Sequence, residues 1–474
     1  MIRFGRRRSV RRDGLKRLAA FLLAGTALLL SLAQAGSAAA SIPAAPKQDW
    51  TIHYVPEGSA YKLAKAEPES GVYLGAYVLQ DNTIGRSMQA FNEKTGRKHA
   101  SFFKYVGYGM PYPADWVEEV KAAGAFPHIA WEPNGGLAQV KDDAYLRQFA
   151  EQAGRSGVPI FLRFASEMNG TWTNYGGNPD KYKETWRAVH RIFAERAPNV
   201  AMVWTVLAMP EGTIEKFYPG DAYVDWVGVN VYNVKYHDGL RSFRASDEDP
   251  LDLLNYVYNR FSRTKPIQLS EFGVTHFNTT DGVHDTRFAA VRLSRLYRHL
   301  EHRYPRVKAV YYFNVNNVAE PNEARRINDY SLTGEPELLA AYRLATASEH
   351  FLDRPVPAAL AGSYVAQRFT YRGRVFKEGG VLYADELFYT RMMMLGISFA
   401  PDGRPGLAAV SAQKNGRYRM SAPIKVVRRN IWTGTTTSGG RRIYRTVRAL
   451  PLRQVVQAAG LRVHLRGNNI YIQE

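Results

Sequence analysis

The stretch Ile160-Phe-Leu-Arg-Phe-Ala-Ser-Glu-Met-Asn-Gly-Thr-Trp172 begins as an apolar run and turns polar at its carboxyl end. The run predicts a buried strand, and Glu167 comes soon after it. A second stretch of the same design, Pro266-Ile-Gln-Leu-Ser-Glu-Phe-Gly-Val274, delivers Glu271. Barrel enzymes place catalytic groups at the carboxyl ends of their strands. One such acid is more often a helix cap or a solvated loop residue, but two in matching positions indicate a pair.

Similar apolar runs alternate with amphipathic stretches from Val72 to about residue 350. Eight runs over roughly 280 residues fit a (β/α)8 TIM barrel, an α/β fold whose usual size is about 250 residues. A doubly wound open sheet is less well supported, because no glycine-rich phosphate fingerprint follows the first run. The expected strands are 72–78, 100–108, 126–131, 159–164, 200–206, 224–232, 266–269 and 307–315. The expected helices include 113–123, 142–155, 179–196, 249–263 and 285–304.

In this count Glu167 closes the fourth strand and Glu271 the seventh, so both face the mouth of the barrel. Hydrolysis of a glycosidic bond with retention needs two carboxyl groups about 5–5.5 Å apart. One protonates the leaving oxygen while the other attacks the anomeric carbon, so their surroundings must separate their pKa values. Arg163, on the fourth strand, is placed to keep Glu271 ionised.

Four motifs together resemble glycoside hydrolase family 26, the β-mannanase family, over roughly residues 72–345. They are Arg163, Glu167-Met-Asn-Gly-Thr-Trp172, Asp225-Trp-Val-Gly-Val-Asn-Val-Tyr232 and Ser270-Glu-Phe-Gly273. The resemblance implies that Glu167 is the general acid/base and Glu271 the nucleophile of a retaining enzyme. It also implies that Tyr232 donates a hydrogen bond to the nucleophile and that Trp172 stacks on a sugar.

Two positions depart from the family pattern. Ser166 stands where the family usually has a histidine that positions the nucleophile and the bound sugar, which puts mannose specificity in doubt. The eighth strand ends in Tyr311-Tyr-Phe-Asn314, where a tryptophan is more usual. We therefore expect this chain to share the catalytic mechanism of the family, whereas its substrate can differ from mannan.

Other strand ends supply further candidates for substrate binding. Trp131 either flanks a sugar or belongs to the barrel core, and Glu132 beside it is better explained as a solvated loop acid. Asn169 and Asn230 suit hydroxyl recognition, with loop hydrogen bonding as the alternative. The expected substrate-binding residues are Arg163, Asn169, Trp172, Tyr232, Trp131 and Asn230.

The absence of cysteine excludes disulfides, thiolate metal sites and cysteine nucleophiles. The 11 histidines show no metal-ligand spacing such as His-x-x-x-His, and no Gly-x-Ser-x-Gly elbow is present. The sequence therefore predicts neither a metal site nor a cofactor.

The amino terminus has the form of an export signal. Eight basic residues precede an apolar run from Leu18 to Leu32 and small-residue cleavage sites. An uncleaved anchor is the less favoured alternative, and no other segment looks transmembrane. We expect a signal peptide over 1–40, a linker over 41–70, the barrel over 71–350 and a basic C-terminal α+β domain over 351–474.

The net charge of +20 is unevenly distributed. Residues 360–474 carry 19 basic and 5 acidic residues, whereas residues 41–359 carry 36 and 37. A basic extracellular tail suits an anionic cell-wall polymer better than nucleic acid. The segment 444–472 resembles the stalk-like domain named after the N-terminus of copper amine oxidases, and Leu382–Gly396 predicts an amphipathic helix. The tail is either a spacer or a module that holds polymer.

These observations predict a secreted or wall-associated bacterial enzyme, of Gram-positive type, with no stable membrane span after signal cleavage. It is expected to hydrolyse a β-linked polysaccharide internally, either a mannan or the producer's own exopolysaccharide. The alternatives are a transglycosylase and a catalytically silent glycan-binding protein.

Overall fold

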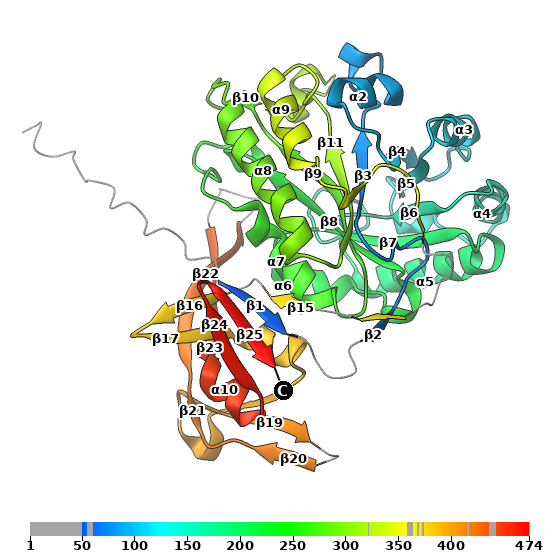
Figure 1. Cartoon of the computed structure of the whole chain (residues 1–474). Coiled ribbons are helices and arrows are strands. Elements are labelled where there is room, and N and C mark those ends of the chain that lie inside the picture. Colours follow the sequence, from blue (N-terminus) through cyan, green and yellow to red (C-terminus); the bar gives the residue numbers. More distant parts are fainter. Residues whose placement is uncertain are drawn as a thin grey trace, which may run out of the picture. The chain divides into compact units, whose positions relative to one another are not determined.

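A computed structural model describes residues 50–54, 60–320, 322–357, 364–366, 369–371, 374–414, 417–435 and 442–473. Its largest sheet is the barrel (Figure 1), whose eight strands are β3 (Val72–Tyr77), β4 (Ser101–Gly107), β5 (Phe126–Glu132), β6 (Ile160–Phe164), β7 (Val200–Leu207), β8 (Trp226–Asn233), β9 (Ile267–Val274) and β11 (Val307–Phe313). The expected signal peptide lies outside the described residues.

All neighbouring strands of the barrel are parallel, and the sheet closes on itself. The closing pair joins β11 to β3, with Ala309 opposite Tyr73 and Phe313 opposite Tyr77. The fourth strand is β6 and the seventh is β9, as the sequence predicts. The (β/α)8 fold is therefore confirmed.

Helices follow most barrel strands and cover the outside of the sheet (Figure 1). They are α2 (Met88–Thr95), α3 (Ala114–Ala122), α4 (Ala144–Arg155), α5 (Pro179–Arg196), α6 (Glu211–Ile214), α7 (Pro250–Phe261), α8 (Thr286–Arg303) and α9 (Pro336–Ala345). Several begin where a side chain accepts from the first turn: Asn178 caps α5 through Asp180 N and Lys181 N, and Asp249 caps α7 through Leu251 N. These starts agree with the helices expected from the sequence.

The two faces of the barrel sheet have different partners, because successive side chains of a strand point to opposite sides. Val72, Leu74 and their counterparts pack against the helices, while Tyr73 and Tyr77 belong to a separate cluster with Phe103, Phe161 and Tyr311. This second cluster fills the barrel. A Cβ at Gly75 would overlap the Tyr311 ring, so glycine is needed there for the interior to close.

A short segment before the first barrel strand carries a buried ion pair. Glu67 Oε1 lies 2.8 Å from Arg306 Nη1, and both side chains are inaccessible to solvent or nearly so. Glu67 Oε2 also accepts from Ala64 N at 2.9 Å. Part of the expected linker 41–70 is thus anchored to the residue that precedes β11.

The remaining strands form smaller sheets, apart from β13, which pairs parallel with β3 as a ninth strand of the largest sheet. They are β1 (Thr51–Tyr54), β2 (Ala60–Lys62), β10 (Phe277–Asn278), β12 (Asn328–Asp329), β13 (Phe351–Leu352), β14 (Tyr364–Ala366), β15 (Phe369–Tyr371), β16 (Val375–Glu378), β17 (Val381–Asp385), β18 (Gly396–Phe399), β19 (Leu407–Lys414), β20 (Arg417–Met420), β21 (Ile424–Lys425), β22 (Val427–Thr435), β23 (Arg442–Pro451), β24 (Arg462–Arg466) and β25 (Asn469–Gln473). With α10 (Leu452–Ala458), those after residue 364 make up a C-terminal α+β region.

Strand β1 lies in a sheet with C-terminal strands, in the order β15-β1-β25-β24. It pairs antiparallel with β15 and parallel with β25. Ile52 is fully buried in the same apolar cluster as Val455 and Ile470. Residues far apart in sequence therefore share one small core, which the sequence did not predict.

The expected helix Leu382–Gly396 is wrong over most of its length. Residues Val381–Asp385 form strand β17, and the helical residues run only from 386 to 392, with Phe388–Met392 as a π-helix. The segment begins within a short continuous apolar run, Val381-Leu-Tyr-Ala384, which suits a strand, and pairing with β16 and β23 satisfies the backbone there. Strands β24 and β25 pair antiparallel as a hairpin near the chain end. Among the described helices, none combines the length and apolar character that a membrane span requires.

Candidate active site

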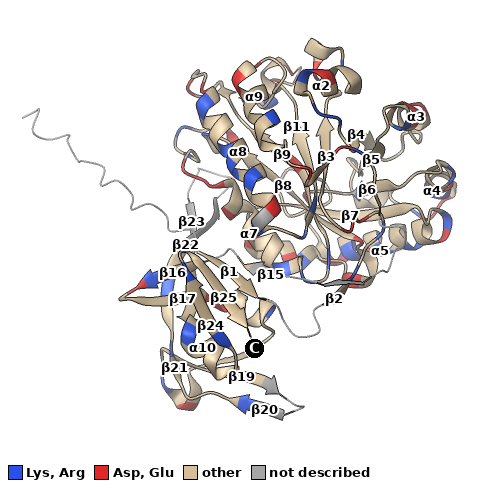
Figure 2. Cartoon of the chain, viewed as in Figure 1, with Lys and Arg blue, Asp and Glu red and all other residues tan. Residues whose placement is uncertain are grey.

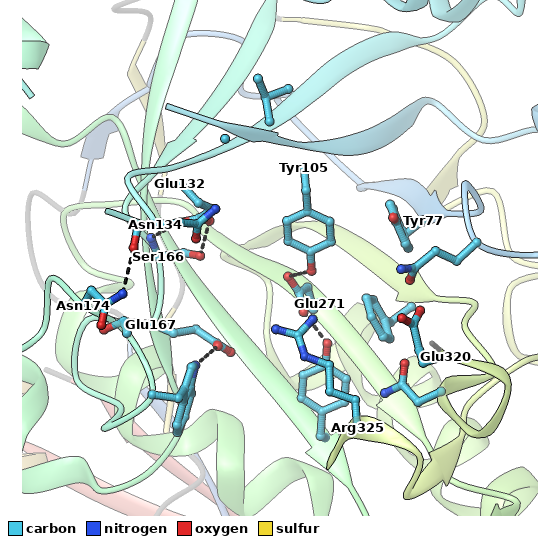
Figure 3. Close-up of a pocket in the computed structure, with 18 of the residues that line it drawn as sticks. Tyr77, Tyr105, Glu132, Asn134, Ser166, Glu167, Asn174, Glu271, Glu320 and Arg325 are labelled. Carbon is cyan, nitrogen blue, oxygen red and sulfur yellow. Dashed lines mark hydrogen bonds between the residues drawn. The ribbon is translucent and has the colours of Figure 1, made fainter. Parts of the chain in front are cut away.

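A cleft of about 720 Å³ opens at the carboxyl ends of the barrel strands and is lined by both predicted catalytic acids. Glu167 follows β6, and Glu271 lies on β9. In the view of Figure 3, Glu132, Ser166 and Asn174 lie on the same side of Glu271 as Glu167, and Tyr77 and Glu320 lie on its other side. The structure thus brings together in one cleft the pair that the sequence predicts.

Glu167 sits on a turn whose backbone is unusual. Its φ angle is +56° and that of Ala165 is +47°, in the left-handed region that side chains other than glycine seldom adopt. Such conformations cost on the order of 1 kcal/mol each and persist where the surroundings hold them. Here Glu167 N donates to Thr205 O at 3.0 Å, and Gly170 N donates to Glu167 O at 2.8 Å. These bonds fix the acid at the end of the strand.

The Glu167 carboxyl group is held by two N–H donors. Asn230 Nδ2 donates to one oxygen at 2.8 Å, and Trp172 Nε1 donates to the other at 3.1 Å. Burial raises the pKa of Glu167 to about 7, with a further upward contribution from the negative charge of Glu271. The Asn230 hydrogen bond and the charge of Arg163 act in the opposite direction. Glu167 therefore exchanges a proton near neutral pH, as a general acid/base must.

Glu271 has a different environment. Arg163 Nη2 forms an ion pair with its Oε1 at 2.6 Å, and Tyr105 OH donates to the same oxygen at 2.5 Å. Tyr232 OH donates to Oε2. A cation and two hydroxyl donors thus surround the Glu271 carboxyl group, which acts only as a hydrogen-bond acceptor in these contacts.

The groups around Glu271 keep their own protons. Burial raises the pKa of both Tyr105 and Tyr232 well above the usual value for tyrosine, and the charge of Glu271 adds to the effect. Burial disfavours the charge of Arg163, but Glu271 and the other acids around it outweigh this and raise its pKa. All three therefore remain donors over the range in which Glu167 titrates.

Three residues expected to bind substrate take other positions. The prediction that Trp131 binds substrate is wrong. Its side chain is fully buried on the outer face of β5, where it stacks on Phe149 of α4 with 4.2 Å between ring centroids. Asn169 is not in the cleft lining, because its amide bonds the backbone of Leu207 through both ends, at 2.9 Å each. Arg163 is inaccessible to solvent and contacts Glu271 instead of lining the cleft.

Two other predicted substrate-binding residues, Trp172 and Tyr232, do line the cleft, and Trp172 is 57% exposed. Asn230 contacts the cleft indirectly, through its hydrogen bond to Glu167.

The interpretation of Glu132 as a solvated loop acid is also wrong. It is 9% exposed, and it accepts from Ser166 Oγ at 2.6 Å, Ser166 N at 3.0 Å and Tyr175 OH at 2.7 Å. Ser166, the residue that departs from the family pattern, is thus part of a small polar cluster in the cleft wall. Tyr105 was missed as a partner of Glu271, because a tyrosine within an aromatic run carries no distinguishing signal.

Comparison with known proteins gives one family match. The matching family is described as glycosyl hydrolase family 26, and the match covers residues 133–246. Endoglucanase H of Acetivibrio thermocellus is 26% identical over 297 residues, which is 58% of this chain and 30% of that protein. A beta-1,3-xylanase, TXYA, from a Vibrio species is 31% identical over 191 residues, 35% of this chain and 39% of that protein. The chain thus spans well under half the length of either relative.

Similar solved structures include the catalytic domain of the family 26 endo-β-1,4-mannanase of Bacillus sp. JAMB-750, at 14% identity and a TM-score of 0.45. The alignment covers 63% of this chain and 96% of that one. The family match ends before Glu271, whose assignment rests on the geometry described above. It does include Glu167, Trp172, Asn230 and Tyr232, so this part of the chain is similar to glycosyl hydrolase family 26.

Proposed function

We propose that this protein is an exported retaining endo-glycosidase that hydrolyses a β-linked polysaccharide. The observation that carries the proposal is the contrast between the two acids of one cleft. Glu167 has a pKa raised to about 7, whereas Glu271 pairs with Arg163 and accepts from two tyrosines. Two carboxyl groups kept in different protonation states are what double displacement requires.

In the first step the Glu271 carboxylate attacks the anomeric carbon while the Glu167 carboxyl group protonates the departing glycosidic oxygen. The bond from carbon to that oxygen breaks, and a glycosyl ester of Glu271 forms. In the second step Glu167, now ionised, takes a proton from water as the water oxygen attacks the same carbon. The ester bond breaks, which restores both acids and retains the configuration.

The proposed substrate has a β-linked backbone, in agreement with relatives named as an endoglucanase and as beta-1,3-xylanases. A mannan or the producer's own exopolysaccharide remains within the proposal. The Ser166–Glu132–Tyr175 cluster replaces the family's histidine at the cleft wall, so a preference other than mannan is expected at the sugar-binding subsite next to it. Export rests on the basic and apolar segment of residues 1–40.

The test is reducing-sugar release by the mature protein from β-mannan, β-1,3-xylan, mixed-linkage β-glucan and the producer's exopolysaccharide. Glu271→Ala and Glu167→Gln are assayed alongside, and product lengths and anomeric configuration are followed. We expect one polymer to be shortened internally, β-configured ends to form first, and both variants to lose at least about 10³-fold in rate.

Two outcomes would contradict the proposal. Initial release of inverted ends would exclude double displacement. Binding of a polymer with no release, unchanged by Glu167→Gln, would identify a glycan-binding protein without turnover.

A further inference from the structure

Three metal-ligating groups converge away from the two catalytic acids. His276 follows β9, His284 precedes α8, and Glu335 is the residue before α9. The distance from His276 Nδ1 to His284 Nε2 is 3.2 Å, and that from His284 Nε2 to Glu335 Oε1 is 3.1 Å. His276 Nδ1 and Glu335 Oε1 are 3.9 Å apart. All three ligand atoms thus lie within 3.9 Å of one another.

The spacing of these atoms matches the coordination sphere of a zinc ion. Ligands of tetrahedral Zn²⁺ lie about 2.0–2.1 Å from the metal, which places neighbouring ligand atoms roughly 3.3 Å apart. Two sides of the triangle agree with that edge within a few tenths of an ångström, and the third needs only a small side-chain movement. Two imidazoles and one carboxylate are also a donor set that zinc accepts.

The surroundings of His276 have the form of a metal site's outer shell. Its other ring nitrogen, Nε2, lies 3.2 Å from Asp329 Oδ1, within ion-pair distance but without the geometry of a hydrogen bond. Asp329 Oδ1 is in turn held by Ser331, whose N and Oγ donate to it at 2.8 and 2.6 Å. A carboxylate behind a ligating histidine directs the opposite nitrogen toward the metal.

The backbone holds the cluster together in the absence of an ion. Phe277 pairs with His284 across a bridge, and Asp285 N donates to His276 O at 2.6 Å. Strand β10 pairs with β12, which brings Asp329 beside the loop. His276 is 2% exposed whereas His284 is 51% exposed, so an ion can enter from the His284 side and keep water as a fourth ligand.

We propose that His276, His284 and Glu335 form a structural Zn²⁺ site that joins two loops of the barrel mouth. One loop runs from β9 to α8, and the other runs from β11 to α9. The second loop supplies Asn317, Glu320, Arg325 and Tyr330 to the cleft. Zinc fixes this wall of the cleft without touching the bond that is broken, so the proposal is independent of the proposed reaction.

The test uses the tag-free mature protein, treated with chelator and then titrated with ZnCl₂. We expect about one zinc per chain by elemental analysis and a rise of several degrees in melting temperature at saturation. His284→Ala and Glu335→Gln should each weaken zinc binding at least about 10-fold and remove most of the rise. His464→Ala, a change of an exposed histidine in β24, is the matched control and should keep both.

Because His284 is half exposed, its replacement should leave the zinc-free melting temperature nearly unchanged, so a failure to fold does not confuse the result. Two results would overturn the proposal. One is a melting temperature that does not respond to zinc in the unsubstituted protein, as for a hydrogen-bonded histidine pair that binds no metal. The other is a response that His284→Ala and Glu335→Gln retain in full.

Discussion

The carboxyl group of Glu167 illustrates how much of the site depends on single contacts. Its oxygens are shared between Asn230 on β8 and the exposed Trp172, while its backbone is fixed to Thr205 on β7. Asn230 also stands opposite Glu271 in the sheet register, next to an irregularity between Val229 and Asn230. The extra residue is Ser270 of β9, and this local shift sets Glu271 opposite Asn230, whose amide donates to Glu167.

The raised pKa of Glu167 predicts a definite dependence on pH. Folding raises this pKa from 4.5 to about 7, so the folded state binds the proton more tightly than the unfolded state. The resulting stability is present in full below about pH 4.5 and is lost as the pH rises through about 7. Catalysis should decline over the upper part of the same range, because the protonated acid disappears.

Glu167→Gln should remove this dependence. We expect the variant to match the unsubstituted protein near pH 4.5 and to be more stable at pH 8 by on the order of 2 kcal/mol. Urea denaturation at both values measures the difference, with Glu119→Gln on the surface of α3 as control. Equal stability of Glu167→Gln and the unsubstituted protein at pH 8 would contradict the assigned shift.

At the scale of elements, the strands and helices of the barrel were predictable because their hydrophobic periods are strong. Side-chain direction was harder to predict. The alternation along β5 turns His128 into the barrel and Trp131 toward α4, and only the register of the closed sheet decides which of the two faces is inside. Glu132, the next residue, therefore points into the cleft wall, where Ser166 Oγ and Tyr175 OH donate hydrogen bonds to its carboxylate.

The contacts of Tyr105 and of the histidine cluster could not be predicted for a related reason. Tyr105 and Glu271 are 166 residues apart, and Glu335 lies 51 residues after His284, so no local spacing connects them. Motif reading finds groups that act together only when the chain also places them close in sequence, or when a family pattern lists them.

The segment from Ala60 to Glu67 offers an element-scale prediction. Its Glu67–Arg306 pair is buried, and the Arg306 guanidinium also lies 3.5 Å from the centre of the Tyr61 ring. Removing one partner leaves a buried charge without compensation, so Glu67→Ala should lower the free energy of unfolding by about 3–5 kcal/mol. Urea denaturation measures the loss.

The comparison for that prediction is Glu118→Ala, which breaks the exposed pair with Lys121 and should cost less than about 1 kcal/mol. Similar losses for the two variants would mean that Glu67 does not anchor the segment before β3.

At the scale of the whole molecule, charge separates the two regions. The segment that forms the barrel is close to neutral, while basic residues occur on several C-terminal elements, including β20 and β24 (Figure 2). Exposed examples are Lys377, Arg404, Arg419, Lys425, Arg428, Arg453 and Arg466. This distribution supports the proposal that the C-terminal region holds an anionic polymer.

Replacing Lys425, Arg428 and Arg466 together by glutamate tests that role. We expect the unsubstituted protein to bind a phosphate-rich wall polymer at about 50 mM salt and to lose most binding near 500 mM, because salt screens exposed charges. The triple variant should bind weakly at both, with hydrolysis of a neutral glycan unchanged. A pull-down measures binding. Equal retention of both proteins would indicate that the C-terminal region acts as a spacer and does not bind the polymer through these charges.

The position of β1 between β15 and β25 has a consequence for biosynthesis. Thr51 pairs with Asn469, so 418 residues of chain separate the partners. At about 5–20 residues per second, a ribosome needs roughly 20–80 s to deliver the second strand after the first. The barrel sequence emerges entirely within that interval, while the edge of β1 that pairs with β25 stays open. Nascent chains stalled before residue 469 should therefore expose β1 to chaperones and proteases even when the barrel has already closed.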